Sequence, residues 1–348
     1  MKNYILFHDN CMDGWYSGVM AFLKAKYDGN REVVPLAVQY GQDPAVASSG
    51  DLVTIVDFSY KADVIDAYVD SGVNVCLIDH HETAIIDLIN NSKVVNEVFP
   101  SMDHGDIKED NDIIITNTHD DDFSSFSSLN RIDADPVGKA AFYLSVNKGN
   151  KADRKSGALT CLCILRRSES SGFIRNKLVF TLGDSIVKEI HLASSYDLWN
   201  HGGELQCDES YLNQYFKSFY EDNKAYFELL KVSRYKSEGF NKAVMTKLIT
   251  KYFSVSYEDK LAKGKQIINA YGGVAERLAN ILREVKPVTF LLDEYKDVTV
   301  GLIESDNLTS DLTSLAGTVI YSKMGFNVAA LINTAKDSDS TIISLRSN

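Results

Sequence analysis

The chain has 348 residues, of which 45% are hydrophobic and 24% are charged, and its formal net charge is −12. This length allows two domains, and the composition is that of a folded globular protein, not of a disordered chain. The acidic balance argues against a general binder of long nucleic acids, which would normally carry a basic surface. A small anionic ligand is compatible with it, because a bound cation reverses the local field.

The five cysteines follow no spacing that is typical of a zinc site or a disulfide framework. The apolar run near the N-terminus is too short for a signal peptide. No segment approaches the roughly 18 consecutive apolar residues of a membrane span. We therefore expect a cytoplasmic protein that does not associate with a membrane.

Short apolar runs alternate with amphipathic segments over the N-terminal part of the chain. The runs at 4–8, 33–38, 52–58 and 73–79 predict strands. The segments at 15–26, 61–71 and 83–90 predict helices. Continuous apolar strands that are separated by helices indicate a parallel sheet covered on both faces. The sequence thus predicts an α/β fold.

Residues 101–135 interrupt this alternation with an acidic, serine-rich insertion. Helical patterns resume after it, at 136–146, 156–165 and 184–193. The stretch 211–231 is amphipathic and rich in aromatic residues, which is typical of a helix that connects two domains.

A second, smaller α/β unit is predicted to follow the connecting helix. Its pattern predicts helices at 258–284 and 309–323, and strands at 288–293, 298–304, 328–333 and 341–347. We therefore expect a catalytic domain over 1–205, a connecting helix over 206–235 and a smaller domain over 236–348.

Three of the four predicted N-terminal strands end in acids or histidines. The residues concerned are His8, Asp9 and Asp13 after the first strand, Asp57 after the third, and Asp79, His80 and His81 after the fourth. The carboxyl ends of parallel strands meet at one edge of a sheet, so these side chains are expected to converge. Carboxylate and imidazole ligands suit Mn²⁺ or a similar divalent ion, and Asp57 is the natural bridge between two ions. A purely structural carboxylate–histidine contact would explain one strand end but not three.

Several stretches resemble the motifs of one enzyme family. "FHDNCMDGWYSG" (7–18), "VDFSYK" (56–61) and "LIDHHET" (77–83) resemble the first three motifs of the DHH phosphoesterase superfamily. "SSYDLWNHG" (194–202) is similar to the fourth motif, and "KSGALTCLCIL" (155–165) to the helix between the third and fourth. The branch that the chain resembles most is the group of oligoribonucleases (nanoRNase B) and cyclic-nucleotide phosphodiesterases.

The resemblance is strong over 1–205, and weaker from about residue 225 onward, where the chain is similar to the DHH-associated substrate-binding domain. It implies a phosphodiesterase that uses two Mn²⁺ ions, with Mg²⁺ or Co²⁺ as substitutes, and acts on short oligonucleotides or cyclic (di)nucleotides. The metal ligands that it implies are His8, Asp13, Asp57, His80 and Asp197.

The resemblance also implies roles around the metal ligands. His81 would face the substrate phosphate, and Asp79 would accept a hydrogen bond from a histidine and so fix its tautomer. Arg346 matches the phosphate-binding arginine of the family's last strand. His201 lies four residues after Asp197 and is a further candidate for the substrate-binding site.

Two positions depart from the family pattern. Cys11 stands where many relatives have an aspartate, and a thiolate is a softer ligand than Mn²⁺ prefers, so both Cys11 and Asp9 are candidate ligands. The sequence ends at "ISLRSN", where relatives continue into a glycine-rich loop that grips the substrate.

These departures favour an alternative function, a protein that binds or sequesters nucleotides with a degenerate metal site. The otherwise intact ligand set favours the enzyme. Within the superfamily, an exonuclease and a pyrophosphatase are further alternatives. A homodimer is compatible with the sequence.

Overall fold

The structure is a computed structural model of the whole chain. The residues that it describes are 1–29, 31–98, 112–116, 140–145, 147, 154–167, 178, 182–198, 200, 206–235, 237–270, 285–289, 299–304, 316, 320, 324, 326–334 and 341–347. They form two compact units, one made of residues 1–200 and 212–262, the other of 201–211 and 263–348. Each unit contains one β-sheet.

The sheet of the first unit has six strands in the order β2-β1-β3-β4-β6-β5. The strands are β1 (Lys2–His8), β2 (Glu32–Val38), β3 (Leu52–Val56), β4 (Asn74–Asp79), β5 (Asp112–Thr116) and β6 (Ala140–Ser145). Five of them run parallel, and β5 pairs antiparallel with β6 at one edge. The predicted α/β fold with a parallel sheet is confirmed.

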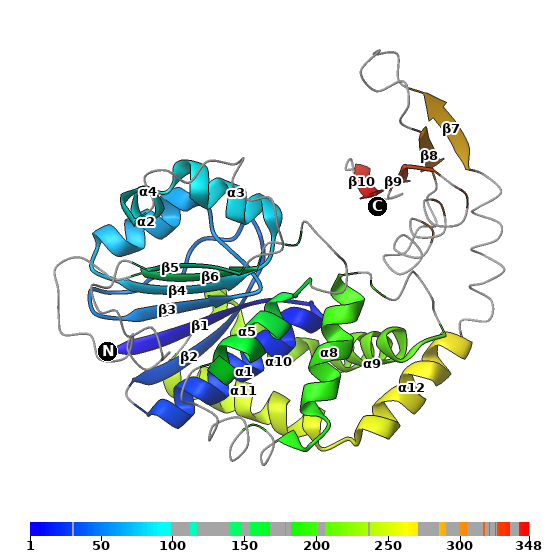
Figure 1. Ribbon diagram of the computed structural model, residues 1–348. Helices are drawn as coiled ribbons and strands as arrows, with labels where there is room; N and C mark the ends of the chain where they lie inside the picture. Colours follow the sequence, from blue (N-terminus) through cyan, green and yellow to red (C-terminus); the bar gives the residue numbers. More distant parts are fainter. Residues whose placement is uncertain are drawn as a thin grey trace. The chain divides into compact units, whose positions relative to one another are not determined.

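Helices cover both faces of this sheet (Figure 1). One layer contains α1 (Met12–Asp28), α5 (Gly157–Arg167) and α8 (Ile186–Asp197), and the other contains α2 (Ala62–Asp70), α3 (Glu82–Asn91) and α4 (Lys93–Val98). Side chains alternate across a strand. Ile5 and Phe7 of β1 therefore pack against the first layer, and Tyr4 and Leu6 against the second.

The strand order contains a reversal next to β1. After β1 the chain places β2 on one side of it and β3 on the other. Open α/β sheets bind ligands beside such a switch point, beyond the carboxyl ends of the strands. The candidate residues that follow β1 and β3 therefore lie where this topology favours a binding site.

Two predictions about the middle of the chain were wrong or incomplete. Residues 140–145 lie in the predicted helix 136–146, but they form the fully buried strand β6 between β4 and β5. The run "AAFYLS" is apolar at every position except the last, which suits a strand that is buried on both faces, and strand pairing overrides its helical pattern. The acidic insertion contains the edge strand β5, which was not predicted.

The predicted connecting helix consists of two helices, α9 (Asp208–Asp222) and α10 (Lys224–Leu230), and η5 (Val232–Arg234) follows them. The next two helices along the chain are α11 (Glu238–Phe253) and α12 (Tyr257–Ala270). The helix α11 was not predicted, and it packs on β2, where Asn241 Nδ2 donates to the carbonyl oxygen of Pro35 at 3.3 Å. The predicted boundaries at 205 and 235 do not coincide with the two units, because residues 212–262 pack with the N-terminal sheet.

The sheet of the second unit is small and mixed, in the order β10-β9-β8-β7. Its strands are β7 (Lys286–Thr289), β8 (Thr299–Glu304), β9 (Val328–Thr334) and β10 (Thr341–Ser347). Each overlaps a predicted strand. The end of the predicted helix 258–284 and most of 309–323 lie outside the described residues. Among the helices that the structure describes, none has the length and apolarity needed to cross a membrane.

Candidate metal centre

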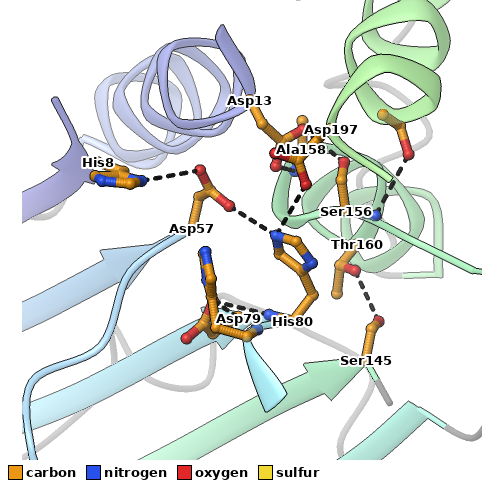
Figure 2. Close-up of polar contacts among 12 residues, drawn as sticks. His8, Asp13, Asp57, Asp79, His80, Ser145, Ser156, Ala158, Thr160 and Asp197 are labelled. Carbon is orange, nitrogen blue, oxygen red and sulfur yellow. Dashed lines mark hydrogen bonds and ion pairs between the residues drawn. The ribbon is translucent and has the colours of Figure 1, made fainter. Parts of the chain in front are cut away.

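Side chains from three strand ends and two helices converge at the carboxyl edge of the parallel sheet (Figure 2). The residues are His8 at the end of β1, Asp57 after β3, Asp79 and His80 at the end of β4, Asp13 in the first turn of α1, and Asp197 at the end of α8. The convergence predicted from the strand ends is therefore present, and α1 and α8 complete it.

The approach of α1 to β1 depends on glycine. A Cβ atom at Gly14 would lie 2.4 Å from the carbonyl oxygen of His8, and one at Gly18 would lie 2.6 Å from Cγ of Phe7. No side chain fits at these separations, so glycine alone lets the helix lie this close to the strand. The close packing brings Asp13 over the end of the sheet.

Asp13 is held in place by the start of α5. Its Oδ1 accepts a hydrogen bond from Ser156 Oγ at 2.5 Å, and its Oδ2 accepts one from the backbone N–H of Ala158 at 3.1 Å. The first N–H groups of a helix lack partners within that helix, so a carboxylate satisfies one of them. Neither Ser156 nor Ala158 was predicted to lie at the site, although a serine that precedes an apolar helix is a recognisable start signal.

Asp57 lies at the centre of the cluster. Its backbone has a φ of 54°, which is uncommon for a residue other than glycine and marks a conformation found at functional sites. Its Oδ1 lies 3.1 Å from His80 Nε2, and its Oδ2 lies 3.8 Å from His8 Nδ1. His80 Nε2 also lies 3.3 Å from Asp197 Oδ2, so the contacts form a chain across the cluster.

Two atoms that take part in these contacts, His8 Nδ1 and Asp57 Oδ2, are buried without a hydrogen-bond partner. Buried polar atoms are normally paired. A nitrogen and a carboxylate oxygen of the kinds that bind divalent ions face each other here at 3.8 Å. This is the arrangement expected of two ligands that share a cation.

The electrostatics of the cluster also favour a cation. Burial, and then the negative charges of Asp13 and Asp197, raise the pKa of Asp57 well above its ordinary value. Burial raises the pKa of Asp197 to about 6 in the same surroundings. Burial, and then the charge of His81, lower the pKa of His8 to about 4, so its imidazole is neutral and able to bind a metal. A divalent ion would relieve the repulsion among these carboxylates.

Among the residues that the structure describes, three groups of side chains have ligand atoms within 4.8 Å of one another. The groups are Asp57, Asp79, His80 and His81; His8, Cys11 and Asp57; and Asp13, His80 and Asp197. Asp57 and His80 each belong to two of them, so neighbouring groups share ligands. Two adjacent cations need such shared ligands, above all a bridging carboxylate.

Asp79 and His81 form a tight pair beside the cluster. Asp79 Oδ1 lies 2.6 Å from His81 Nδ1 and accepts a hydrogen bond from the backbone N–H of His80 at 2.8 Å. Burial alone would raise the pKa of Asp79, but the bond with His81 holds it below its ordinary value. Burial would lower the pKa of His81, but the same bond raises it to about 9. At neutral pH the pair is therefore a carboxylate and an imidazolium.

The two alternative ligands of the first motif differ in where they lie. Asp9 belongs to none of the groups found among the described residues, and its Oδ1 accepts a hydrogen bond from the Tyr220 hydroxyl at 3.0 Å. Lys231 Nζ lies 3.8 Å from Asp9 Oδ2. Cys11 does join His8 and Asp57. Burial, and then the nearby carboxylates, raise the pKa of the Cys11 thiol well above its ordinary value, which keeps it protonated.

The two predicted substrate-binding residues cannot be placed in the cluster. His201 lies outside the described residues. Arg346 is in β10, where it pairs with Ala329, but its side chain is outside the described part of the structure.

Asn147 was not predicted. Its Nδ2 lies 3.5 Å from His80 Nδ1 and donates to the carbonyl oxygen of Lys155 at 3.0 Å, while its Oδ1 accepts from the Lys155 N–H at 2.9 Å. Asn147 therefore supports the side of His80 that faces away from Asp57. Nothing in its local sequence signals this role.

Comparison with protein-family models finds no match, and comparison with curated proteins finds no similar sequence. The fold and the site define an α/β protein with a cluster of histidines and carboxylates at the carboxyl edge of a parallel sheet.

Gly157 offers a test of how closely the cluster is packed. A Cβ atom at this position would lie 2.7 Å from both Cβ and Oδ1 of Asp57. If Asp57 binds a divalent ion such as Mn²⁺, Gly157→Ala is expected to displace the carboxylate and weaken that binding about 10- to 100-fold, as altered support of a metal ligand commonly does. Calorimetric titration with Mn²⁺ measures the change.

Gly239→Ala is the matched control, because Gly239 also lies in the first turn of a helix and a Cβ there would meet nothing within 4 Å. Its Mn²⁺ affinity should equal that of the parent. Unchanged affinity in Gly157→Ala would show that Asp57 is not a metal ligand.

Proposed function

We propose that the protein is a divalent-metal-dependent phosphodiesterase of the DHH type, which hydrolyses short oligonucleotides or cyclic (di)nucleotides with Mn²⁺ as its metal. The observation that carries the proposal is the set of three ligand groups joined through Asp57 and His80 at the carboxyl edge of the sheet. The resemblance of four sequence stretches to the DHH motifs supports it.

The donor set fits a pair of hard or borderline divalent ions. His8 and Asp57, with a further ligand from the first motif, would hold one ion, and the second would take Asp13, Asp57, His80 and Asp197. Imidazole and carboxylate suit Mn²⁺, with Mg²⁺ and Co²⁺ as substitutes. Two such ions, when bound, supply a nucleophile from water at neutral pH and neutralise charge on the phosphate.

His81 has the form needed to act on the substrate itself. Its Nδ1 is engaged by Asp79, so Nε2–H is the donor left for a phosphate oxygen. The raised pKa keeps the ring positively charged at neutral pH. A fixed cationic donor stabilises the negative charge that develops on the phosphate oxygens during displacement. Asp79 holds the ring in that orientation.

The substrate class follows from charge as well as from resemblance. A net charge of −12 opposes the tracking of a long polyanion, whose binding depends on many basic contacts. A short nucleotide needs neutralisation only at the scissile phosphate, which a metal pair can provide. We therefore favour dinucleotides, short oligomers and cyclic nucleotides over long strands.

The alternative is a protein that binds nucleotides without hydrolysing them. The thiol of Cys11 in the group with His8 and Asp57 favours it, because sulfur is a softer ligand than Mn²⁺ prefers. Turnover assays with dinucleotides, oligomers, cyclic mononucleotides and cyclic dinucleotides, with and without Mn²⁺, separate the two functions. Mn²⁺-dependent hydrolysis is the expected result, and tight binding without turnover would establish the alternative.

Removing the imidazole of His81 should slow hydrolysis without releasing metal. We expect His81→Ala to lower kcat about 100-fold or more, as loss of one oxyanion donor does in other enzymes. The bound Mn²⁺ should stay at the parent's level, which metal analysis of the purified protein measures. His191→Ala is the control, since this histidine lies on the exposed side of α8. Loss of a whole equivalent of Mn²⁺ from His81→Ala would make His81 a metal ligand instead.

A further inference from the structure

An exposed aromatic ring lies beside the candidate metal centre. Tyr40 follows β2 and is 53% exposed. Its ring centroid lies 5.5 Å from that of His8 and 6.2 Å from that of His81. The ring therefore borders the cluster, and it contacts His8 within the cluster and His81 beside it.

The ring of Tyr40 packs against a buried aromatic ring. Its centroid lies 4.7 Å from that of Phe58, which is buried next to Asp57 in the chain. The backbone before Tyr40 is also fastened, because Gln39 Nε2 donates to the carbonyl oxygen of Asp9 at 2.8 Å and Gln39 N–H donates to Gln42 Oε1 at 3.1 Å. A ring that is held in this way loses little conformational freedom when a ligand stacks on it.

The chemistry of the ring suits a nucleobase better than a phosphate. Burial, and then the charges of Asp79 and Asp57, raise the pKa of Tyr40, so its hydroxyl is neutral. A neutral aromatic face attracts no anion, but any nucleobase can stack on it. In a nucleotide one ribose separates the base from its phosphate, so a phosphate at the metal centre would bring its own base close to this ring.

We infer that Tyr40 is the platform on which the nucleobase next to the scissile phosphate stacks. It would thereby set the preference for nucleotides over phosphodiesters that lack a base. This inference rests on the proposed function for the identity of the substrate, and it deepens that proposal by naming the residue that recognises the base.

The test compares two ligands that differ only by a base. Adenosine 5′-monophosphate and ribose 5-phosphate are titrated into the protein by calorimetry in the presence of Mn²⁺. The parent is expected to bind the nucleotide about tenfold or more tightly than the sugar phosphate, in line with the usual strength of base–aromatic stacking. Tyr40→Ala should bind the two ligands equally, while its affinity for ribose 5-phosphate stays at the parent's value.

Further variants separate stacking from a merely structural role. Tyr40→Phe and Tyr40→Trp keep an aromatic face, so both should retain the preference. Tyr27→Ala is the matched control, because Tyr27 is also 53% exposed but lies near the end of α1. Thermal unfolding checks each variant. Should Tyr40→Ala fail to fold, Tyr40→Leu keeps an apolar contact with Phe58 and tests the same point.

The inference is overturned if the parent shows no preference for the nucleotide, or if Tyr40→Ala weakens both ligands by the same factor. Its failure is distinguishable from that of the proposed function. A Tyr40-dependent preference without any hydrolysis would support base stacking on Tyr40 and contradict the phosphodiesterase. Hydrolysis with a preference that does not depend on Tyr40 would support the phosphodiesterase and overturn the inference about Tyr40.

Discussion

Asp57→Asn is expected to abolish phosphodiester hydrolysis, with a loss of about a thousandfold or more in kcat/KM, or about 4 kcal/mol of transition-state stabilisation. The two oxygens of Asp57 lie toward different histidines, Oδ1 at 3.1 Å from His80 and Oδ2 at 3.8 Å from His8. The asparagine amide offers one neutral oxygen and an NH₂ group that binds no cation, so it cannot hold two dications together. Turnover and bound Mn²⁺ are measured on the same preparation.

The same substitution should not harm the fold. Burial and the neighbouring carboxylates disfavour the ionised form of Asp57, as its raised pKa shows. The neutral amide is free of that cost, so the metal-free variant should unfold at the same temperature as the metal-free parent or a higher one. A loss of activity without a loss of stability is the result expected if Asp57 acts in function and does not stabilise the fold.

Asp66→Asn is the matched control. Asp66 is also buried, but its oxygens accept hydrogen bonds from Ser92 Oγ and from the Lys93 N–H, both at 2.7 Å, away from the cluster. This variant should lose stability and keep its turnover. Near-normal hydrolysis by Asp57→Asn in added Mn²⁺ would contradict the two-metal proposal.

Lys260→Met is expected to lower the free energy of unfolding by about 3–5 kcal/mol, the usual result of removing one partner from a buried ion pair. Lys260 Nζ lies 2.8 Å from Glu189 Oε2, and both side chains are only 1% exposed. Tyr16 and Ser185 also donate to the Glu189 carboxylate, at 2.7 and 3.1 Å. These two hydroxyl groups are neutral, so the loss of Lys260 would leave the buried Glu189 carboxylate without its cationic partner. Urea unfolding measures the difference.

Two further variants make this measurement specific. The double variant Lys260→Met/Glu189→Gln should recover part of the loss, because the unpaired charge is gone. Lys224→Met should change stability by less than about 1 kcal/mol, since its pair with Glu221 is exposed. If Lys260→Met costs no more than Lys224→Met, the buried pair does not stabilise the fold. Glu189 precedes Asp197 on α8, so the pair also anchors the helix that carries this candidate metal ligand.

The strand ends of the cluster could be predicted because the signal is local. An apolar run followed by "HDNCMDG", "DF" or "DHH" predicts both a buried strand and the polar groups at its end. Parallel pairing then places those ends together without any knowledge of side-chain positions. His8, Asp57, Asp79 and His80 therefore lie together as expected.

The strand and the helix that were not predicted from the sequence depend on packing partners that are distant in the sequence. The run at 140–145 is compatible with a helix in isolation and becomes a strand because β4 and β5 supply its hydrogen bonds. The helix α11 belongs to the first unit because it packs on β2 and α10. In both cases tertiary packing decides between local alternatives that have similar intrinsic free energies.

The sequence by itself determined which strands end in carboxylates and histidines and that a parallel sheet gathers them, because residue type and periodicity are local properties. Only the tertiary structure decided which of the gathered groups face one another. Asp9 lies one residue after His8, yet it faces Tyr220 and Lys231, and Asn147 reaches His80 across 67 positions of the chain. Side-chain direction at the end of a strand depends on the helices packed beside it, and those contacts join residues too distant in the sequence for any local pattern to encode.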